Sequence, residues 1–164
     1  MSEEVTKRRT RTADEAYAAL ARLCARAEKS SGDARRLMRT WGVPESEREG
    51  VLKRLLRERF IDDRRYASAF VREKIALSGW GPYKIRTALT AKGVAREIID
   101  EALGECDHTK MDSRLEQMLN RKLGSLRTGT PYERRAKLMR YGLSLGYDYS
   151  TVADRVEELI KEID

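Results

Sequence analysis

The chain has 164 residues, of which 40% are hydrophobic and 37% are charged, and its formal net charge is +7. This length allows one large domain or a few small units, and the large charged share favours thin helices with wide solvated faces over a single thick globule. No apolar run is long enough to span a membrane and the first twelve residues are too polar for a secretory signal, so we expect a cytoplasmic protein with no membrane partner.

Basic residues exceed acidic residues by 34 to 27. This excess favours nucleic acid or an acidic protein surface as a partner, and it is equally compatible with a soluble basic protein that binds neither. Cys24 and Cys106 are far apart in the sequence and form no CxxC pair. Two such thiols are typical of a reducing compartment, and no disulfide is expected.

Residues 1–12 are polar and contain the basic run from Lys7 to Arg11, which predicts a flexible basic tail. A solvated tail is the simpler interpretation, and an arm that grips phosphates is the alternative.

The region 13–60 has the pattern of a first three-helix unit. Apolar residues at helical spacing predict each helix, residues 30–33 form a turn with capping side chains before the second helix, Gly42 ends that helix, and Pro44 opens the third. The side chains expected to face inward are Tyr17, Leu20, Ala21, Cys24, Ala27, Ala34, Leu37, Met38, Trp41, Val51, Leu52, Leu55 and Leu56.

The region 61–104 is a second unit of the same kind. Asp62 and Asp63 predict a helix start, because carboxylates accept hydrogen bonds from the free backbone N–H groups there. Residues 79–82 separate the first two helices, and Gly93 suits the left-handed end of the second. The side chains expected to face inward are Tyr66, Phe70, Ile75, Ile85, Leu89, Val94, Ile98, Ile99 and Leu103.

Residues 105–110, which include the single histidine His108, are predicted to be a linker, and residues 111–164 form a third unit. Residues 124–130 are expected to be a loop, Pro131 opens the second helix of this unit, and Gly146 closes it. The side chains expected to face inward are Leu115, Met118, Leu119, Leu123, Tyr132, Ala136, Met139, Leu143, Val152, Val156, Leu159, Ile160 and Ile163.

Gly42, Gly93 and Gly146 therefore each end the second helix of a unit, about fifty residues apart. No short unit of this kind buries its apolar face alone, so neighbouring units must stack. The sequence predicts an all-α tandem array of three three-helix repeats, elongated and curved.

Charge divides within the second and third units. Residues 64–92 hold seven basic and one acidic residue, whereas residues 93–109 hold one basic and five acidic residues. Residues 110–145 hold nine basic and three acidic residues, and residues 146–164 hold two and six. This alternation predicts an electropositive stripe formed by the first and second helices. The alternative is that each surface mixes charges only for solubility.

The basic side chains near aromatic residues are the candidate binding residues, because Arg and Lys form charge-assisted bonds with phosphates and carboxylates. Such binding is salt-sensitive. We expect Lys84, Arg86 and Lys92 to keep their charged groups in water beside the buried Ile85 and Leu89. Trp80 either stacks on a base or partner, or packs between helices, as is more usual. The candidates are Arg72, Lys74, Lys84, Arg86, Lys92, Arg134, Arg135, Lys137 and Arg140.

The motifs of catalysis are missing from the sequence. There is no HExxH, no clustered Cys/His ligand set, no GxxxxGK[ST] and no nucleophile elbow. Residues 79–81 are only superficially like a phosphate-binding loop, since they join two helices. Helix capping explains Asp62 and Asp63 better than metal or acid–base chemistry. We therefore expect a protein that is not an enzyme and that needs no cofactor or metal.

The second unit resembles the core of the RecX regulatory proteins over about forty residues. Ala88 departs from the resemblance, where the family usually has Glu, and so does Ala95, where a capping Ser is common and a weaker cap results. The matching residues are Ile61, Asp62, Asp63, Arg65, Tyr66, Ala67, Phe70, Val71, Gly79, Gly81, Pro82, Ile85, Arg86, Leu89, Lys92, Gly93 and Val94.

The resemblance implies a bacterial regulator of DNA repair and the SOS response. RecX-like proteins bind the RecA–DNA filament, lodge in its helical groove, and restrain RecA's ATP hydrolysis, strand exchange and co-protease activity. The resemblance also implies the RecA filament as a partner, with weak and salt-sensitive contact to single- or double-stranded DNA. No dimerisation heptad is evident, so we expect a monomer. The alternative is a stand-alone helical DNA-binding module, since three-helix units with a basic second helix are similar to helix-turn-helix proteins.

Overall fold

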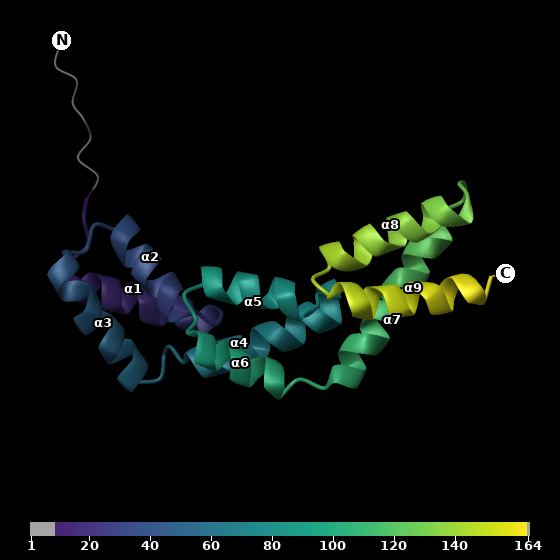
Figure 1. Ribbon diagram of the computed structural model, residues 1–164. Helices are drawn as coiled ribbons and strands as arrows, with labels where there is room; N and C mark the ends of the chain where they lie inside the picture. Colours follow the sequence, from purple (N-terminus) through teal and green to yellow (C-terminus); the bar gives the residue numbers. More distant parts are fainter. Residues whose placement is uncertain (1–8, 164) are drawn as a thin grey trace, which may run out of the picture. The chain divides into compact units, whose positions relative to one another are not determined.

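The computed structural model describes residues 9–163, and the regular structure in this part of the chain is entirely helical (Figure 1). The all-α fold predicted from the sequence is confirmed. Residues 1–8 of the predicted basic tail lie outside the described residues. The helices are α1 (Ala13–Arg26), α2 (Ser31–Thr40), α3 (Glu45–Arg57), α4 (Asp63–Glu73), the π-helical segment η1 (Lys74–Ser78), α5 (Pro82–Ala91), α6 (Arg96–Gly104), α7 (His108–Ser125), α8 (Pro131–Ser144) and α9 (Tyr149–Lys161).

The chain forms two compact units. Among the described residues, the first unit contains those up to Tyr66 together with Ala91–Val94, and the second contains Ala67–Thr90 together with those from Ala95 onward. The α-helices follow one another as three triplets, α1–α3, α4–α6 and α7–α9. The repeat boundaries given above and the curvature of the array stay predictions.

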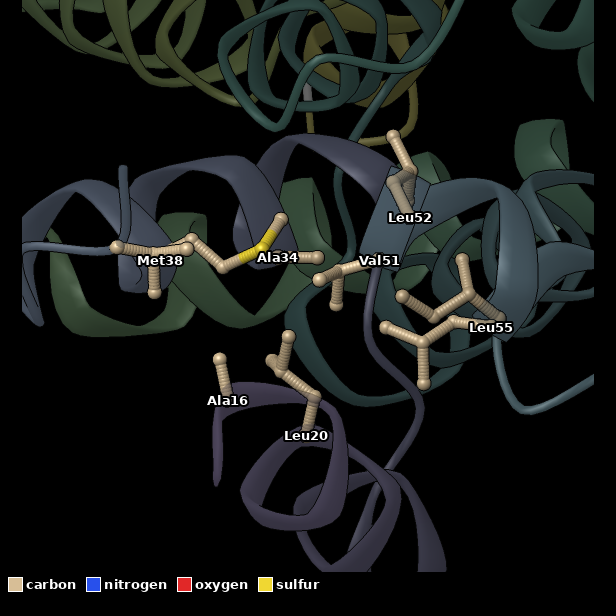
Figure 2. Close-up of a cluster of buried hydrophobic side chains, with 9 residues drawn as sticks. Ala16, Leu20, Ala34, Met38, Val51, Leu52 and Leu55 are labelled. Carbon is tan, nitrogen blue, oxygen red and sulfur yellow. The ribbon is translucent and has the colours of Figure 1, made fainter. Parts of the chain in front are cut away.

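The core of the first unit is built by α1, α2 and α3. Figure 2 shows their apolar side chains converging on one space, with Leu20 from α1, Met38 from α2 and Leu55 from α3, all of them fully buried. Fully burying a side chain of this size stabilises the fold by about 1.5–3 kcal/mol. This shared core explains why none of the three helices needs to be stable alone.

Side chains close the starts of several helices. Thr12, Ser30 and Thr130 each form a capping box. The hydroxyl accepts a hydrogen bond from the backbone N–H three residues later, and the acidic side chain of that later residue accepts one from the backbone N–H of the capping residue. Asp62 accepts from the backbone N–H of Arg65 at 3.1 Å. The capping role predicted for residues 30–33 and for Asp62 is confirmed.

In the second unit, α7, α8 and α9 pack on one another. Leu119, Leu138 and Val152 are fully buried there. Gly142 of α8 lies so close to Val152 of α9 that an added methyl group would overlap its side chain. The glycine therefore sets the close approach of these two helices.

The predicted inner face of α8 is wrong. Tyr132 is 79% exposed and Leu143 is 40% exposed, whereas Leu138 and Gly142 are buried. The buried stripe is shifted because Gly142, which carries no hydrophobic signal, lies at its centre. A stripe drawn only through large apolar residues misses such a face.

Several other expectations fail at the edges of helices. The second half of the predicted linker belongs to α7, which starts at His108 after the capping Asp107 and continues to Ser125. Ala27, Leu56 and Ile163 were expected to face inward and are exposed. Each of the three lies at or beyond the last turn of its helix, where no neighbouring helix covers it.

Candidate partner-binding surface

The turn at residues 79–82 is fixed by backbone contacts within the second unit. Gly79 adopts a left-handed conformation with φ of 67°, which ends the π-helical segment η1. The Gly81 N–H donates to the carbonyl of Leu145 at 2.7 Å, and the Tyr83 N–H donates to the carbonyl of Gly146 at 3.0 Å. The first turn of α5 is therefore held against the turn between α8 and α9.

Tyr147 strengthens the same contact. Its side chain is buried, and its hydroxyl donates to the carbonyl of Met111 at 3.1 Å and lies 3.4 Å from the carbonyl of Trp80. Burial, and to a smaller extent the negative charge of Asp112, raises the pKa of Tyr147 to about 12. The hydroxyl thus stays a neutral donor at physiological pH.

Two lysines flank the indole ring of Trp80. The Nζ of Lys74 and the Nζ of Lys84 each lie 4.7 Å from the ring centroid, and Phe70 packs edge-on against the ring at 6.3 Å. Lys74 also lies 5.4 Å from the centroid of Phe70. We call these four residues, Phe70, Lys74, Trp80 and Lys84, the Trp80 cluster. The ring is half-buried, so it both packs between helices and presents a surface.

The cluster is suited to hold an anion. Cation–π contact fixes each ammonium group at a cost in solvation that is small at a half-exposed site. Lys84 adds one long hydrogen bond, from Nζ to the carbonyl of Ser144 at 3.4 Å. A lysine has three donors, so both ammonium groups keep donors for a phosphate or a carboxylate.

The side chains of Arg86 and Lys92, which the sequence places in water, are half-exposed, and each also pairs with a carboxylate. Arg86 forms a short ion pair with Asp100 of α6. Lys92 belongs to the first unit, where its Nζ lies 3.4 Å from the buried carboxylate of Asp33 and its carbonyl accepts a hydrogen bond from the Ser30 hydroxyl at 2.7 Å. Helical periodicity predicts which side chains face inward, but it carries no information on which acid a base will meet.

Asp33 explains why Lys92 is structural. Burial alone would raise the pKa of the Asp33 carboxyl, but the backbone N–H of Ser30, the guanidinium of Arg36 and the ammonium of Lys92 together lower that pKa. The Asp33 side chain is 7% exposed, and its carboxylate stays charged. Replacing Lys92 by an acidic residue would place a second negative charge beside it.

The candidates of α8 fall into two pairs. Arg135 forms an ion pair with Glu157 at 3.1 Å, and the Nε of Arg134 is buried without a hydrogen-bond partner among the described residues. Lys137 and Arg140 point outward and make no ion pair among the described residues. Lys137 and Arg140 are therefore the more available cations of this helix. Arg72, the remaining candidate, is exposed at the wall of a cavity in the second unit.

The described residues contain no group of three or more His, Cys, Asp or Glu side chains placed to hold a metal ion. Among the helices described, none is both long and apolar enough to cross a membrane. Burial, more than nearby charge, raises the pKa of each thiol, Cys24 and Cys106. The chemistry presented by this part of the chain is that of cations beside aromatic rings.

Comparison with known proteins identifies the family. A family model described as the second three-helix domain of RecX matches residues 62–103. Regulatory protein RecX of Prosthecochloris aestuarii is 31% identical over 135 residues, which are 81% of this chain and 85% of that protein. The chain belongs to the RecX family.

Other RecX proteins and structures agree in fold. Regulatory protein RecX of a Clostridium botulinum strain is 37% identical over 103 residues, and the chain spans about half the length of that relative, 48%. The crystal structure of RecX from Lactobacillus salivarius has a TM-score of 0.79 at 18% identity and covers 90% of this chain and 96% of that one. A second RecX crystal structure has the same TM-score at 25% identity and covers 92% of this chain and 71% of that one.

The sequence predicted Lys74 and Lys84 as candidates on a basic face with Trp80 nearby, in the segment that the RecX model matches. It did not predict that both lysines lie over one ring, or that Phe70 completes the cluster. Phe70 was assigned to the core from its helical spacing, and only the turn at Gly79 brings Trp80 back against it.

Proposed function

We propose that this RecX-family chain binds the RecA–DNA filament and restrains RecA's ATP hydrolysis, strand exchange and co-protease activity. The observation that carries the proposal is positional: the Trp80 cluster lies inside residues 62–103, the segment that matches the second three-helix domain of RecX. A surface of two lysines on an aromatic ring suits the carboxylates and phosphates of a protein–DNA filament.

The mechanism we propose is steric and electrostatic. The cations of the Trp80 cluster, with Lys137 and Arg140 of α8, meet negative groups of the filament, and the helical array occupies space that filament subunits need. No bond is made or broken by this chain, so we expect it to act stoichiometrically, in proportion to filament rather than as a catalyst.

A stand-alone module that reads duplex DNA is the weaker reading. Helix-turn-helix proteins place the first residues of their second helix against base edges in the major groove. Here the first turn of α5 is occupied by the chain itself, since Gly81 and Tyr83 donate to the carbonyls of Leu145 and Gly146. The backbone at the start of α5 is therefore held against another turn of the chain, which disfavours its insertion into a DNA groove.

RecA-driven ATP hydrolysis on single-stranded DNA, titrated with this chain, tests the proposal. We expect Lys74→Glu with Lys84→Glu to raise the half-inhibitory concentration about tenfold or more, because two charge-assisted contacts become repulsive. Arg121→Glu with Lys161→Glu is a control of equal charge change in the same unit, outside the cluster, and should shift it less than about threefold. Equal loss in both double variants would leave only net charge as the cause.

A second measurement separates the two readings. Labelled duplex is titrated with the chain, with and without preassembled RecA filament, at several salt concentrations. We expect tighter binding to the filament than to bare duplex. Binding to bare duplex that equals filament binding would contradict the proposal and favour the DNA-binding module.

A further inference from the structure

A cavity of about 720 Å³ lies in the second unit, apart from the Trp80 cluster. Three walls enclose it: α4 with η1, the end of α6, and the first half of α7. Its volume is in the range of pockets that bind ligands. Nothing proposed above uses this cavity.

The cavity has an apolar floor. Val71, Ile75 and Ala102 line it and are themselves buried, so an apolar side chain that entered would lose water against carbon on several sides. One wall is the π-helical segment η1, an irregularity that recurs at functional sites. A phosphate alone would gain nothing from such a floor.

Cations predominate among the charged groups of the cavity. Arg72, Lys110 and Arg114 line it, against the carboxylates of Glu105 and Asp107. The Asp107 carboxylate is already used, since it accepts from the backbone N–H of Thr109 at 2.9 Å and caps α7. Arg72 and Arg114 make no ion pair within the described residues.

Arg114 has a buried hydrogen-bond donor without an acceptor among the described residues. Its Nε is buried without a hydrogen-bond partner among the described residues, while its Nη1 donates to Gln117 Oε1 at 3.1 Å. A guanidinium carries five N–H donors, and leaving a buried N–H donor without an acceptor is energetically unfavourable. A carboxylate arriving in the cavity would accept from it.

We propose that this cavity binds a short acidic and apolar peptide segment of a partner protein, with an apolar side chain on the floor and flanking carboxylates on Arg72 and Arg114. Charge complementarity and the apolar floor together select this occupant, because a basic peptide meets the two arginines and a purely acidic one leaves the floor empty. The proposal concerns a site other than the Trp80 cluster and does not rest on the function proposed above.

The test uses the full chain and a fluorescein-labelled peptide, Gly-Asp-Asp-Leu-Phe-Asp-Asp-Gly, whose binding is followed by anisotropy without RecA or DNA. We expect saturable binding with a Kd of about 10–100 µM, a range usual for a short peptide that fills one pocket. Two matched peptides, one with Ser-Ser in place of Leu-Phe and one with Lys in place of each Asp, should bind at least about tenfold more weakly.

Two tryptophan variants of α7 locate the site. Ser113→Trp fills the cavity from an exposed position that lines it, and Asn120→Trp places the same side chain on an exposed position of the same helix outside it. Ser113→Trp should weaken binding about tenfold or more, and Asn120→Trp less than twofold. If Ser113→Trp does not fold, Arg72→Gln serves instead and should weaken binding at least about threefold.

Three outcomes would overturn the proposal: no saturation up to about 1 mM peptide, equal binding of the three peptides, or full binding by Ser113→Trp. Decanoate, a free apolar carboxylate, is titrated in parallel. If it binds in the cavity and the acidic peptide does not, the occupant is a small acid and the peptide proposal is wrong.

Discussion

At two places in this molecule, which we call joints, the start of one helix packs against the turn that follows a later helix. The two joints are stabilised by different side chains. In the polar joint, the start of α2 (Ser30, Gly32, Asp33) meets the turn after α5 at Lys92 and Gly93, within the first unit. In the aromatic joint, the start of α5 (Trp80, Gly81, Lys84) meets the turn after α8 at Gly146 and Tyr147, within the second unit. Each brings backbone against backbone at a pair of glycines.

The difference between the joints is in what surrounds the glycines. The polar joint is closed by a hydroxyl, a buried carboxylate and an ammonium group, and Asp63 adds an acceptor for the Ser31 N–H at 2.8 Å. The aromatic joint is closed by backbone hydrogen bonds and by the neutral hydroxyl of Tyr147. The cations at the aromatic joint are therefore left to face outward, whereas the cation of the polar joint is used internally.

The glycines should be the most sensitive positions of both joints. A Cβ on Gly146 would lie 2.6 Å from the backbone N of Lys84 and would sit on a residue with φ of 95°, and a Cβ on Gly32 would lie 2.9 Å from the Cα of Gly93. We expect Gly146→Ala to lower the free energy of unfolding by about 2–4 kcal/mol and Gly32→Ala by about 1–3 kcal/mol. Chemical denaturation followed by circular dichroism measures both.

Gly50 is the matched control, because it lies inside α3 and an added Cβ meets nothing within 4 Å. Gly50→Ala should stabilise the protein by about 0.5–1 kcal/mol, the usual gain in a helix interior. A stabilising effect of Gly32→Ala as well would mean that α2 and the turn at Gly93 do not approach closely.

The polar joint should also be the one that responds to acid. The pKa of Asp33 is lowered in the folded state, so its contribution is present above the unfolded pKa near 3.8 and is lost as the pH falls through the folded value. At neutral pH we expect Asp33→Asn to destabilise by about 1–2 kcal/mol. The gap between the melting temperatures of wild type and variant should close as the pH falls below about 4.

Asp154→Asn, at an exposed position of α9, provides the comparison and should show little gap at any pH. A gap for Asp33→Asn that persists unchanged at low pH would show that the charge of Asp33 does not contribute.

The two joints separate what the sequence predicts from what it does not. Glycine spacing and capping residues predicted the helices and the closing roles of Gly93 and Gly146, since these are local properties of the backbone. The joints themselves depend on which helix start meets which turn, sixty or more positions away, and no local pattern encodes that. For the same reason, Lys74 and Lys84 were predicted as candidates, but their common contact with the Trp80 ring was not. The buried face of α8 was missed because Gly142, at its centre, carries no hydrophobic side chain.

The aromatic joint should respond to loss of one hydroxyl and not to acid. Tyr147→Phe removes the donor to the Met111 carbonyl, and we expect a loss of about 1 kcal/mol in unfolding free energy. Because the pKa of Tyr147 is raised to about 12, its stabilising contribution is present below the unfolded pKa near 10 and is lost only as the pH rises through about 12. Tyr149→Phe, at a tyrosine that is 69% exposed, should change stability by less than about 0.5 kcal/mol.

The smallest effect separates the ion pairs of Arg86 and Lys92, two residues that were both expected to keep their charged groups in water. Lys92 pairs with a carboxylate that is 7% exposed, whereas both partners of the Arg86–Asp100 pair are exposed, at 42% and 52%. Exposed pairs contribute little because water and salt screen them, and Asp100 keeps Arg96 as a second neighbour at 4.0 Å. We therefore expect Arg86→Gln to change the unfolding free energy by less than about 0.5 kcal/mol and Lys92→Gln to lower it by about 1 kcal/mol, measured by denaturation at low and high salt.

The effect of Lys92→Gln should persist at high salt, and any effect of Arg86→Gln should fade. Equal, salt-sensitive effects would place both pairs at the surface and would return Lys92 to the candidate binding residues. With the expected result, a charge reversal at Arg86 reports on partner binding, whereas one at Lys92 reports mainly on the fold of the polar joint.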